Sequence, residues 1–188
     1  MSHGQAPLPI PVVGRERGVP ESAAQVIRDG LLDPRVVQRY RAKVHVASGD
    51  SSCWFWTGAL HATKGHARYW VGSYLDAHSQ RRDVGVIGHR FGWALVHGWA
   101  ALLDTPVLAH NCDEASCQNP DHLAPATMDS NREDFLRRRW LPGSPLRDVR
   151  GPGGRARAIR AAIRAGGDVT AAQADGLREI DDAQLLLW

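Results

Sequence analysis

The sequence predicts a small mixed α+β domain with a zinc-stapled loop, short flanking helices and extended termini. Three observations lead to this prediction. The 188 residues are enough for one domain with extensions. Between about residues 21 and 140, segments with apolar residues at helical spacing are mixed with short strand-like runs. Two cysteines and a histidine at five-residue intervals lie in the loop between two of these runs, with a spacing that suits a metal ion.

The N-terminal part predicts a disordered arm followed by two helices. Residues 1–20 are rich in proline and glycine and are expected to lack fixed structure. Helices are expected over residues 21–32 and 34–44. Asp33 is a suitable N-cap, and Pro34 then takes the first helical position.

The tryptophan-rich middle of the chain predicts three strands and a buried helix. The strands are expected at residues 53–58, 67–71 and 84–87, with a polar loop over 76–83. The helix is expected over residues 89–97, ending at Gly98. Four tryptophans are assigned to the core: Trp54, Trp56, Trp70 and Trp93.

The next segment predicts strand, metal-bound loop, strand and helix in that order. A strand over residues 107–110 delivers His110 at its end, and a return strand covers 123–126. Thr127 is expected to cap a helix that runs to about Trp140. The chain thus divides into an arm (1–20), a domain (21–140), a basic linker and helix (141–167) and an acidic tail (168–188).

The charge is small overall but uneven. The formal net charge is +3, and 21 of the 23 basic residues are arginine. Ten arginines lie between residues 132 and 164, where only three acidic residues oppose them. Such a cationic segment favours a polyanionic partner. An ordinary solvated basic surface explains the charge run equally well.

The three cysteines favour a metal site. An odd number of cysteines argues against a disulfide framework. Cys112, Cys117 and His122 provide three local ligands, and Cys53 is the remaining cysteine that can complete a tetrahedral zinc site. The alternative is three free thiols in a core.

Two polar residues near this loop are candidates for chemistry. His110 lies two residues before Cys112, and a neutral imidazole can take a proton from water near neutral pH. Asn131 is in the first turn of the helix after Thr127, and its amide oxygen can bind Mg²⁺. The alternatives are that His110 replaces His122 as a zinc ligand, and that Asn131 is an ordinary surface residue.

The chain shows no features of membrane insertion or export. No apolar run approaches the length of a membrane span, and the N-terminus lacks the regions of a signal peptide. We therefore expect a cytoplasmic protein without a membrane partner.

Several separate motifs resemble those of the HNH, or His-Me finger, endonucleases, most closely the zinc-bound His-Cys box type. The similarity covers about residues 40–140. The matching blocks, in chain order, are Cys53-Trp-x-Trp-Thr-Gly, Gly88-His89-Arg90-Phe91, His110-x-Cys112-Asp113-x3-Cys117-x-Asn119-Pro120-x-His122-Leu123, and Asn131.

The resemblance implies a ββα-metal core, structural zinc and one catalytic Mg²⁺, which Mn²⁺ can replace. By position, His110 would be the general base and Asn131 the Mg²⁺ ligand. Asn119 would shape the loop or, in a simpler HNH pattern, orient the strand of His110. Arg68, or else Arg90, would stabilise the charge of the phosphorane. The implied zinc ligands are Cys53, Cys112, Cys117 and His122.

The resemblance also implies double-stranded DNA as the partner, with a homodimer as one arrangement. We expect DNA contacts from Arg81, Arg82, Arg90, Arg132, Arg137, Arg138 and Arg139. The chain departs from the family beside His110, where Ala109 and Asn111 stand in place of an acidic metal ligand. The Gly-Thr that usually precedes the last helix is Ala126-Thr127 here.

The expected function is a metal-dependent DNA endonuclease of homing, phage, plasmid or restriction-like type. Two alternatives remain: a zinc-stapled DNA-binding module with little or no catalysis, and a toxin or defence nuclease that attacks RNA or non-specific DNA. The missing acidic neighbour of His110 keeps the binding module open.

The C-terminal segment Gln184–Trp188 resembles the short Gln-Leu-x-Leu-aromatic peptides with which bacterial proteins bind the replication sliding clamp. In such peptides the leucines and the terminal aromatic residue fill an apolar pocket. The alternative is an apolar C-terminus that folds back on the domain.

Overall fold

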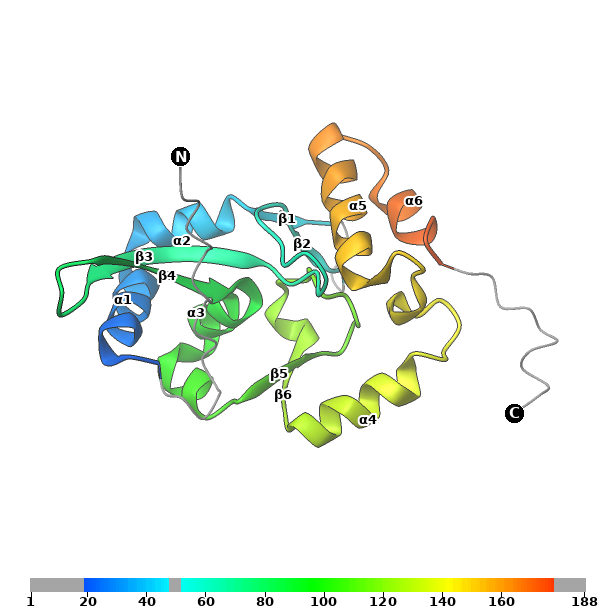
Figure 1. Ribbon diagram of the computed structural model, residues 1–188. Helices are drawn as coiled ribbons and strands as arrows, with labels where there is room; N and C mark the ends of the chain where they lie inside the picture. The colour runs from blue at the N-terminus through cyan, green and yellow to red at the C-terminus, as the bar shows by residue number, and fades with distance from the viewer. Residues whose placement is uncertain (1–18, 48–51, 178–188) are drawn as a thin grey trace, which may run out of the picture.

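A computed structural model describes residues 19–47 and 52–177 (Figure 1). Within these residues the protein is a mixed α+β domain with three two-stranded antiparallel sheets, which confirms the predicted class. The predicted arm up to residue 18 and the segment Gln184–Trp188 lie outside the described residues. No helix of the described part has the length and apolar character needed to cross a membrane.

The first two helices begin where the sequence predicts. Helix α1 spans Glu21–Leu32 and α2 spans Pro34–Arg41. The Asp33 carboxylate accepts a hydrogen bond from the Arg35 amide at 2.8 Å and so caps α2. The prediction that this helix reaches Val44 was wrong, because Val44–Val46 forms β1 and pairs with β2 (Trp54–Trp56). The β-branched valines favour this extended pairing.

Strands β3 (Arg68–Leu75) and β4 (Arg81–Ile87) form a long antiparallel ribbon. Both are longer than predicted, and Arg81 and Arg82 lie in β4 rather than in a loop. The residues next to the turn are mostly polar, and they are strand because the two segments pair with each other. A search for alternating apolar residues does not detect this kind of pairing. Helix α1 packs against β3 and β4.

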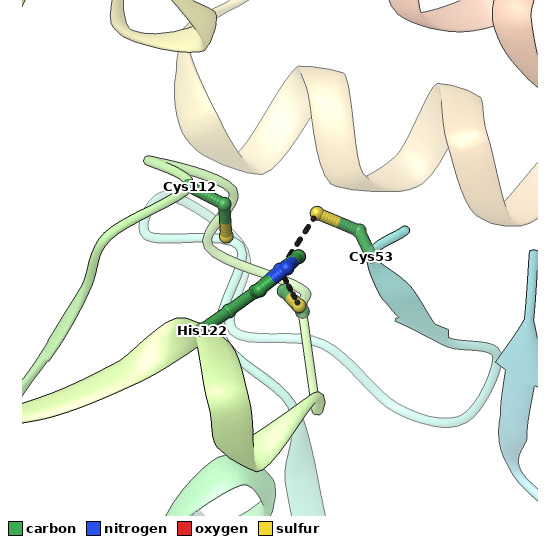
Figure 2. Close-up of side chains that lie close together, drawn as sticks. Cys53, Cys112 and His122 are labelled. Atoms are coloured by element: carbon green, nitrogen blue, oxygen red, sulfur yellow. Dashed lines mark hydrogen bonds between the residues drawn. The ribbon is translucent and has the colours of Figure 1, made fainter. Parts of the chain in front are cut away.

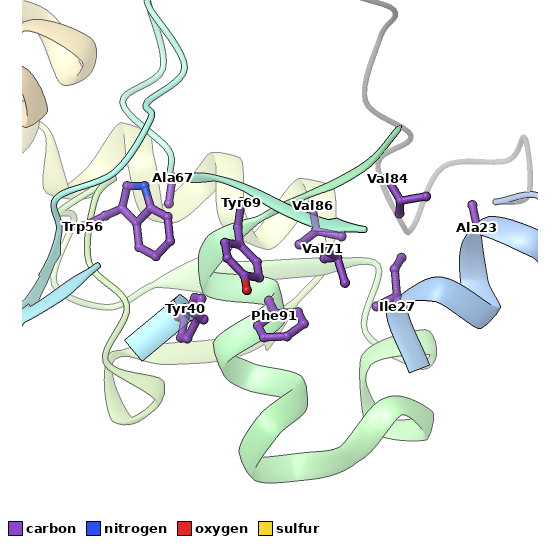
Figure 3. Close-up of a cluster of buried hydrophobic side chains, with 10 residues drawn as sticks. All are labelled: Ala23, Ile27, Tyr40, Trp56, Ala67, Tyr69, Val71, Val84, Val86 and Phe91. Carbon is purple, nitrogen blue, oxygen red and sulfur yellow. The ribbon is translucent and has the colours of Figure 1, made fainter. Parts of the chain in front are cut away.

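An aromatic cluster forms the main core (Figure 3). The Tyr40 and Tyr69 rings meet edge to face at 5.3 Å, and the Trp56 and Phe91 rings pack around them. The assignment of Trp70 to the core was wrong, since its side chain is 44% exposed. Alternation along β3 buries Tyr69 and turns Trp70 outward.

Helix α3 spans Gly88–Leu103 and continues past the predicted end. Gly98 has φ 87° and ψ 165°, so the helix breaks there and then resumes. Its second part contributes Leu102 to a smaller core that also contains Trp93, Leu108 and Leu123. The first part of the helix contributes to both cores, through Phe91 and through Trp93, and the second part adds Leu102 to the smaller one.

Strands β5 (Val107–His110) and β6 (Leu123–Ala126) pair antiparallel over the predicted ranges. The short helix η1 (Pro120–His122) ends the loop between them. Helix α4 (Met128–Arg138) follows, and the Thr127 hydroxyl accepts a hydrogen bond from the Ser130 amide at 3.0 Å. The predicted order of strand, loop, strand and capped helix is confirmed, although α4 ends two residues earlier.

The C-terminal part contains η2 (Pro145–Arg147), α5 (Gly151–Ala165) and α6 (Val169–Ala174). Helix α5 is the helix expected within residues 141–167, and it packs against β2 and α6. Ala156 and Ile159 are each 1% exposed, so this helix has a buried face. Arg157, Arg160 and Arg164 donate hydrogen bonds to main-chain oxygens of residues 57–62. Much of the basic charge therefore anchors α5 to the domain.

Candidate metal centre and adjoining histidines

Four predicted ligands from distant parts of the chain lie together (Figure 2). Cys53 precedes β2, Cys112 and Cys117 lie in the β5–β6 loop, and His122 ends η1. Their ligand atoms all lie within 4.8 Å of one another. The prediction that these side chains converge is confirmed.

The geometry of this cluster suits zinc. The His122 Nδ1 atom lies 3.6 Å from the Cys53 Sγ and 3.6 Å from the Cys117 Sγ. Tetrahedral bonds of about 2.3 Å to sulfur and about 2.0 Å to nitrogen would place such a pair about 3.6 Å apart. Three thiols and one imidazole are also the soft and borderline donors that zinc prefers. The residues present therefore fit this metal.

Main-chain pairing brings the loop to β2. The Gln118 amide donates to the Trp54 oxygen at 2.7 Å, and the Trp56 amide donates to the Ser116 oxygen at 3.1 Å. This pairing sets Cys117 beside the strand that Cys53 precedes. It explains how Cys53, which is distant in the sequence, reaches the three ligands of the β5–β6 segment.

Asn119 shapes the loop. Its Oδ1 accepts a hydrogen bond from the Asp121 amide at 3.0 Å, and its Nδ2 donates to the Ser52 oxygen at 3.1 Å. Pro120 then begins η1. These contacts agree with the loop-shaping role. Among the described residues, no hydrogen bond links the Asn119 side chain to the strand of His110.

Without a metal ion, the pKa values of the Cys117 and Cys53 thiols are shifted in opposite directions. Hydrogen bonds from the Cys112 and Cys53 thiols lower the pKa of Cys117 to about 4. Hydrogen bonds with Cys112 and Cys117, together with burial, raise the pKa of Cys53. A metal ion bound here would take the place of the thiol protons.

A buried ion network, absent from the sequence predictions, connects the loop to α5. Glu114 is 2% exposed and pairs with Arg155 at 2.7 Å. Asp148, also buried, pairs with Arg155 at 3.3 Å and with Arg150 at 2.7 Å. Burial raises the pKa of Glu114, although the Arg155 charge opposes that rise. Glu114 and Arg155 are 41 residues apart in sequence, too far for a local motif to reveal the pair.

His110 ends β5 and lies outside the four-residue cluster. Its Nε2 is 3.1 Å from the Cys117 main-chain oxygen. A carbonyl oxygen only accepts hydrogen bonds, so Nε2 carries the proton and Nδ1 is the basic nitrogen. Among the described residues, Nδ1 has no hydrogen bond. Burial lowers the pKa of His110, which keeps the ring neutral.

Two further histidines lie beside His110. The His89 and His110 ring centroids are 4.5 Å apart, those of His66 and His89 are 5.4 Å apart, and those of His66 and His110 are 6.0 Å apart. Burial, helped by the nearby His110, lowers the pKa of His66 to about 4, and burial also lowers the pKa of His89. The sequence predictions gave His66 no role. The sequence signal that could have pointed to His66 was its position two residues before Arg68, the arginine expected to contact phosphate.

The two arginines considered for transition-state stabilisation lie in different surroundings. Arg68 is exposed at the start of β3, on the face opposite the buried Ala67 and Tyr69. Strand alternation gives His66 the same face as Arg68. Arg90 is 5% exposed, and its guanidinium donates to the main-chain oxygens of Leu102, Thr105 and Pro106. The prediction that Arg90 contacts DNA or phosphate is therefore wrong, because the α3–β5 connection encloses it.

Asn131 and Arg138 occupy one face of α4. They are seven residues apart, which is nearly two full helical turns. Arg138 Nη1 donates to the main-chain oxygens of His110 at 3.2 Å and of Asn111 at 2.9 Å, and it pairs with Asp113 at 3.0 Å. This face is therefore directed at the end of β5. Arg138, expected at a DNA surface, is instead engaged within the domain.

The other predicted DNA-contacting arginines stand at the surface. Arg81 pairs with Asp83, and Arg82 pairs with Asp76. On α4 and just beyond it, Arg132 is exposed, Arg137 pairs with Asp134, and Arg139 lies over the Phe135 and Trp140 rings. Surface ion pairs of this kind are weak, so a phosphate can compete for these side chains.

Comparisons with protein-family models, with curated proteins and with solved structures give no match for this chain.

Proposed function

We propose that the protein is a metal-dependent DNA endonuclease in which His110 acts as the general base. The observation that supports this most strongly is the placement of His110. It lies outside the Cys–His cluster, its Nε2 is held by the Cys117 oxygen, and its Nδ1 has no hydrogen bond from a described residue. A neutral imidazole fixed in one tautomer is suited to take a proton from water.

The order of elements around His110 supports the same proposal. Strand β5, the Cys–His loop, β6 and α4 follow one another as in a ββα-metal core. The motifs in these elements are those that resemble the HNH, or His-Me finger, endonucleases. We therefore assign the β5–α4 segment as the catalytic core.

The proposed reaction is hydrolysis of a phosphodiester. Nδ1 of His110 takes a proton from water, the water oxygen bonds to phosphorus, and the bond to the 3′-oxygen breaks. The products are a 5′-phosphate and a 3′-hydroxyl, whose proton comes from solvent. We assign Arg68, which is exposed at the start of β3, to offset the negative charge that develops on the phosphate.

Asn131 is the residue we assign to a catalytic magnesium ion. It is partly buried and shares the face of α4 that Arg138 directs at β5. Asp113, the acidic residue nearest to His110 in sequence, is paired with Arg138. One amide ligand suits Mg²⁺, which usually keeps several waters and shares phosphate oxygens. When bound, the ion would stabilise the leaving oxygen.

The zinc that fits the cluster would act through structure. The Cys117 thiol belongs to the cluster, while the oxygen of the same residue holds the His110 ring. A metal that fixes Cys117 would therefore also fix the tautomer and direction of the proposed base.

A plasmid-nicking assay tests this proposal. The wild type is expected to nick supercoiled DNA with Mg²⁺ and not with excess EDTA. His110→Ala is expected to lose about 10²- to 10⁴-fold in rate, the usual contribution of a general base. His78→Ala, in the exposed β3–β4 turn, is the matched control and should keep full activity.

The same preparations distinguish the alternatives. DNA binding without nicking at any Mg²⁺ or Mn²⁺ concentration would instead support a zinc-stapled binding module, which the lack of an acidic residue beside His110 also favours. Preferential cleavage of RNA would support a toxin or defence nuclease. Equal nicking by wild type and His110→Ala, with zinc content and circular dichroism unchanged, would overturn the assignment of His110.

A further inference from the structure

Three imidazole rings from separate elements meet beside the Cys–His cluster. His66 precedes β3, His89 is in the first turn of α3, and His110 ends β5. Their ring centroids are 4.5, 5.4 and 6.0 Å apart. None of the three belongs to the Cys–His cluster. The domain thus gathers a second set of nitrogen donors.

Each ring has a nitrogen that no described residue uses. His110 donates through Nε2 to the Cys117 oxygen, which leaves Nδ1. The His89 side chain is 4% exposed, and its Nδ1 is buried without a hydrogen-bond partner. No hydrogen bond within the described part of the chain reaches the His66 ring.

The buried Nδ1 of His89 is the most informative of these atoms. Leaving such a polar atom unpaired costs about 1–3 kcal/mol, so it indicates that something else binds there. The rings of His66 and His110 lie beside the ring that carries this atom. A species held by three imidazoles explains both the unpaired atom and the grouping.

The spacing of the rings is near that of a three-histidine metal site. With metal–nitrogen bonds of about 2.0–2.1 Å, the centroids of three imidazoles around one ion lie about 5 Å apart. The nitrogens are not gathered as closely as the ligand atoms of the Cys–His cluster. Binding therefore requires a ring to turn, and the partly buried His66 ring, free of hydrogen bonds to described residues, is the one that can do so.

We propose that His66, His89 and His110 bind a borderline divalent cation such as Ni²⁺, Co²⁺ or a second Zn²⁺, and that this binding blocks hydrolysis. Imidazole suits these ions, whereas Mg²⁺ prefers oxygen. The block rests on the proposed function, because Nδ1 of His110 cannot bind a metal and accept a proton at the same time. The binding itself does not depend on that function.

Calorimetric titration of the zinc-loaded full-length protein with Ni²⁺ tests the binding. We expect the wild type to bind one Ni²⁺ per chain beyond its zinc. His66→Gln should weaken this binding roughly 10- to 100-fold, the range that even indirect loss of ligand support produces. His78→Gln, an exposed histidine outside the group, should bind as the wild type does.

Metal analysis after the titration must find the original zinc retained, so that Ni²⁺ in the Cys–His cluster is excluded. Circular dichroism must show both variants folded. The absence of a second ion in the wild type would overturn the site. Equal loss of binding in His66→Gln and His78→Gln would also overturn it.

A nicking assay tests the block separately. With Mg²⁺ in excess, micromolar Ni²⁺ should inhibit the wild type and His78→Gln and should inhibit His66→Gln less. Binding of Ni²⁺ without inhibition would contradict the proposed inhibition of hydrolysis and would still support the proposed metal site. Absence of nicking under every condition would contradict the proposed nuclease function, and calorimetry would then decide the site alone.

Discussion

Arg138 reaches from α4 to the end of β5, where its Nη1 donates to the His110 main-chain oxygen at 3.2 Å. The same nitrogen donates to the Asn111 oxygen at 2.9 Å and pairs with Asp113 at 3.0 Å. One side chain thus ties the helix that carries Asn131 to the strand that carries His110. We interpret Arg138 as a positioning residue rather than a phosphate contact.

Replacing Arg138 is therefore expected to impair the chemical step more than DNA binding. In Arg138→Met, the nicking rate at saturating DNA should fall by roughly tenfold or more, because a displacement of about 1 Å in a site can cost 10²-fold. Arg137→Met, which removes an exposed pair with Asp134 and a predicted DNA contact, is the control and should keep the rate at saturating DNA. Weaker DNA binding with an unchanged saturated rate would show that Arg138 acts on phosphate.

Loss of a cluster ligand should release zinc and unfold the β5–β6 loop. Cys117→Ser removes the most buried of the four ligands, and structural zinc contributes about 10–16 kcal/mol of apparent binding energy in small domains. We expect less than one zinc per chain and loss of cooperative thermal unfolding. His97→Ala, on α3 and outside the cluster, should keep its zinc. Unchanged zinc content in Cys117→Ser would refute this ligand set.

Breaking the buried Glu114–Arg155 pair should destabilise the attachment of α5. Arg155→Met leaves the buried Glu114 carboxylate without its closest cation, which typically costs about 3–5 kcal/mol. Urea denaturation measures this loss. Arg157→Met, which removes an exposed hydrogen bond from the same helix to the Ala62 oxygen, should cost less, about 0.5–1.5 kcal/mol. The double variant Glu114→Gln/Arg155→Met should regain part of the loss; no recovery would argue against a charge effect.

His66 should make the fold sensitive to acid. Burial, with the nearby His110, Lys64 and His61, lowers its pKa to about 4, whereas an unfolded histidine titrates near 6.5. The unfolded chain therefore binds more protons between these values, and His66 removes stability as the pH falls from about 6.5 to about 4. The full effect is about 3 kcal/mol.

Urea titrations of the zinc-loaded wild type and His66→Gln at several pH values measure this effect. The difference in unfolding free energy between the two proteins should move in favour of the variant as the pH falls. Zinc release and the titration of His89 affect both proteins, so the comparison largely removes them. A difference that is constant from pH 7 to pH 4 would contradict the lowered pKa.

Local signals were sufficient for the elements that surround the cluster. Strands β5 and β6 and the Thr127 cap were predicted because apolar runs and capping residues report short-range structure. The cluster itself was predictable because metal ligands are few in type, and Cys53 was the one cysteine left to complete it.

Long-range pairing produced what the sequence did not reveal. Strand β1, the full length of the β3–β4 ribbon and the Glu114–Arg155 pair all depend on partners elsewhere in the chain. Arg90 was misassigned for the same reason, since an arginine in a motif carries no local sign of burial. The His66 ring became a candidate only when β3 and β5 placed it beside His110.

With zinc bound, the junction at Cys53 would act as a reversible crosslink. It would join positions about 60 residues apart and would hold them together only in the folded, metal-bound chain. A disulfide would need an oxidant to do this, whereas a thiolate–metal junction needs only free ion. The fraction of intact molecules should therefore follow the concentration of free zinc and fall when a chelator removes it.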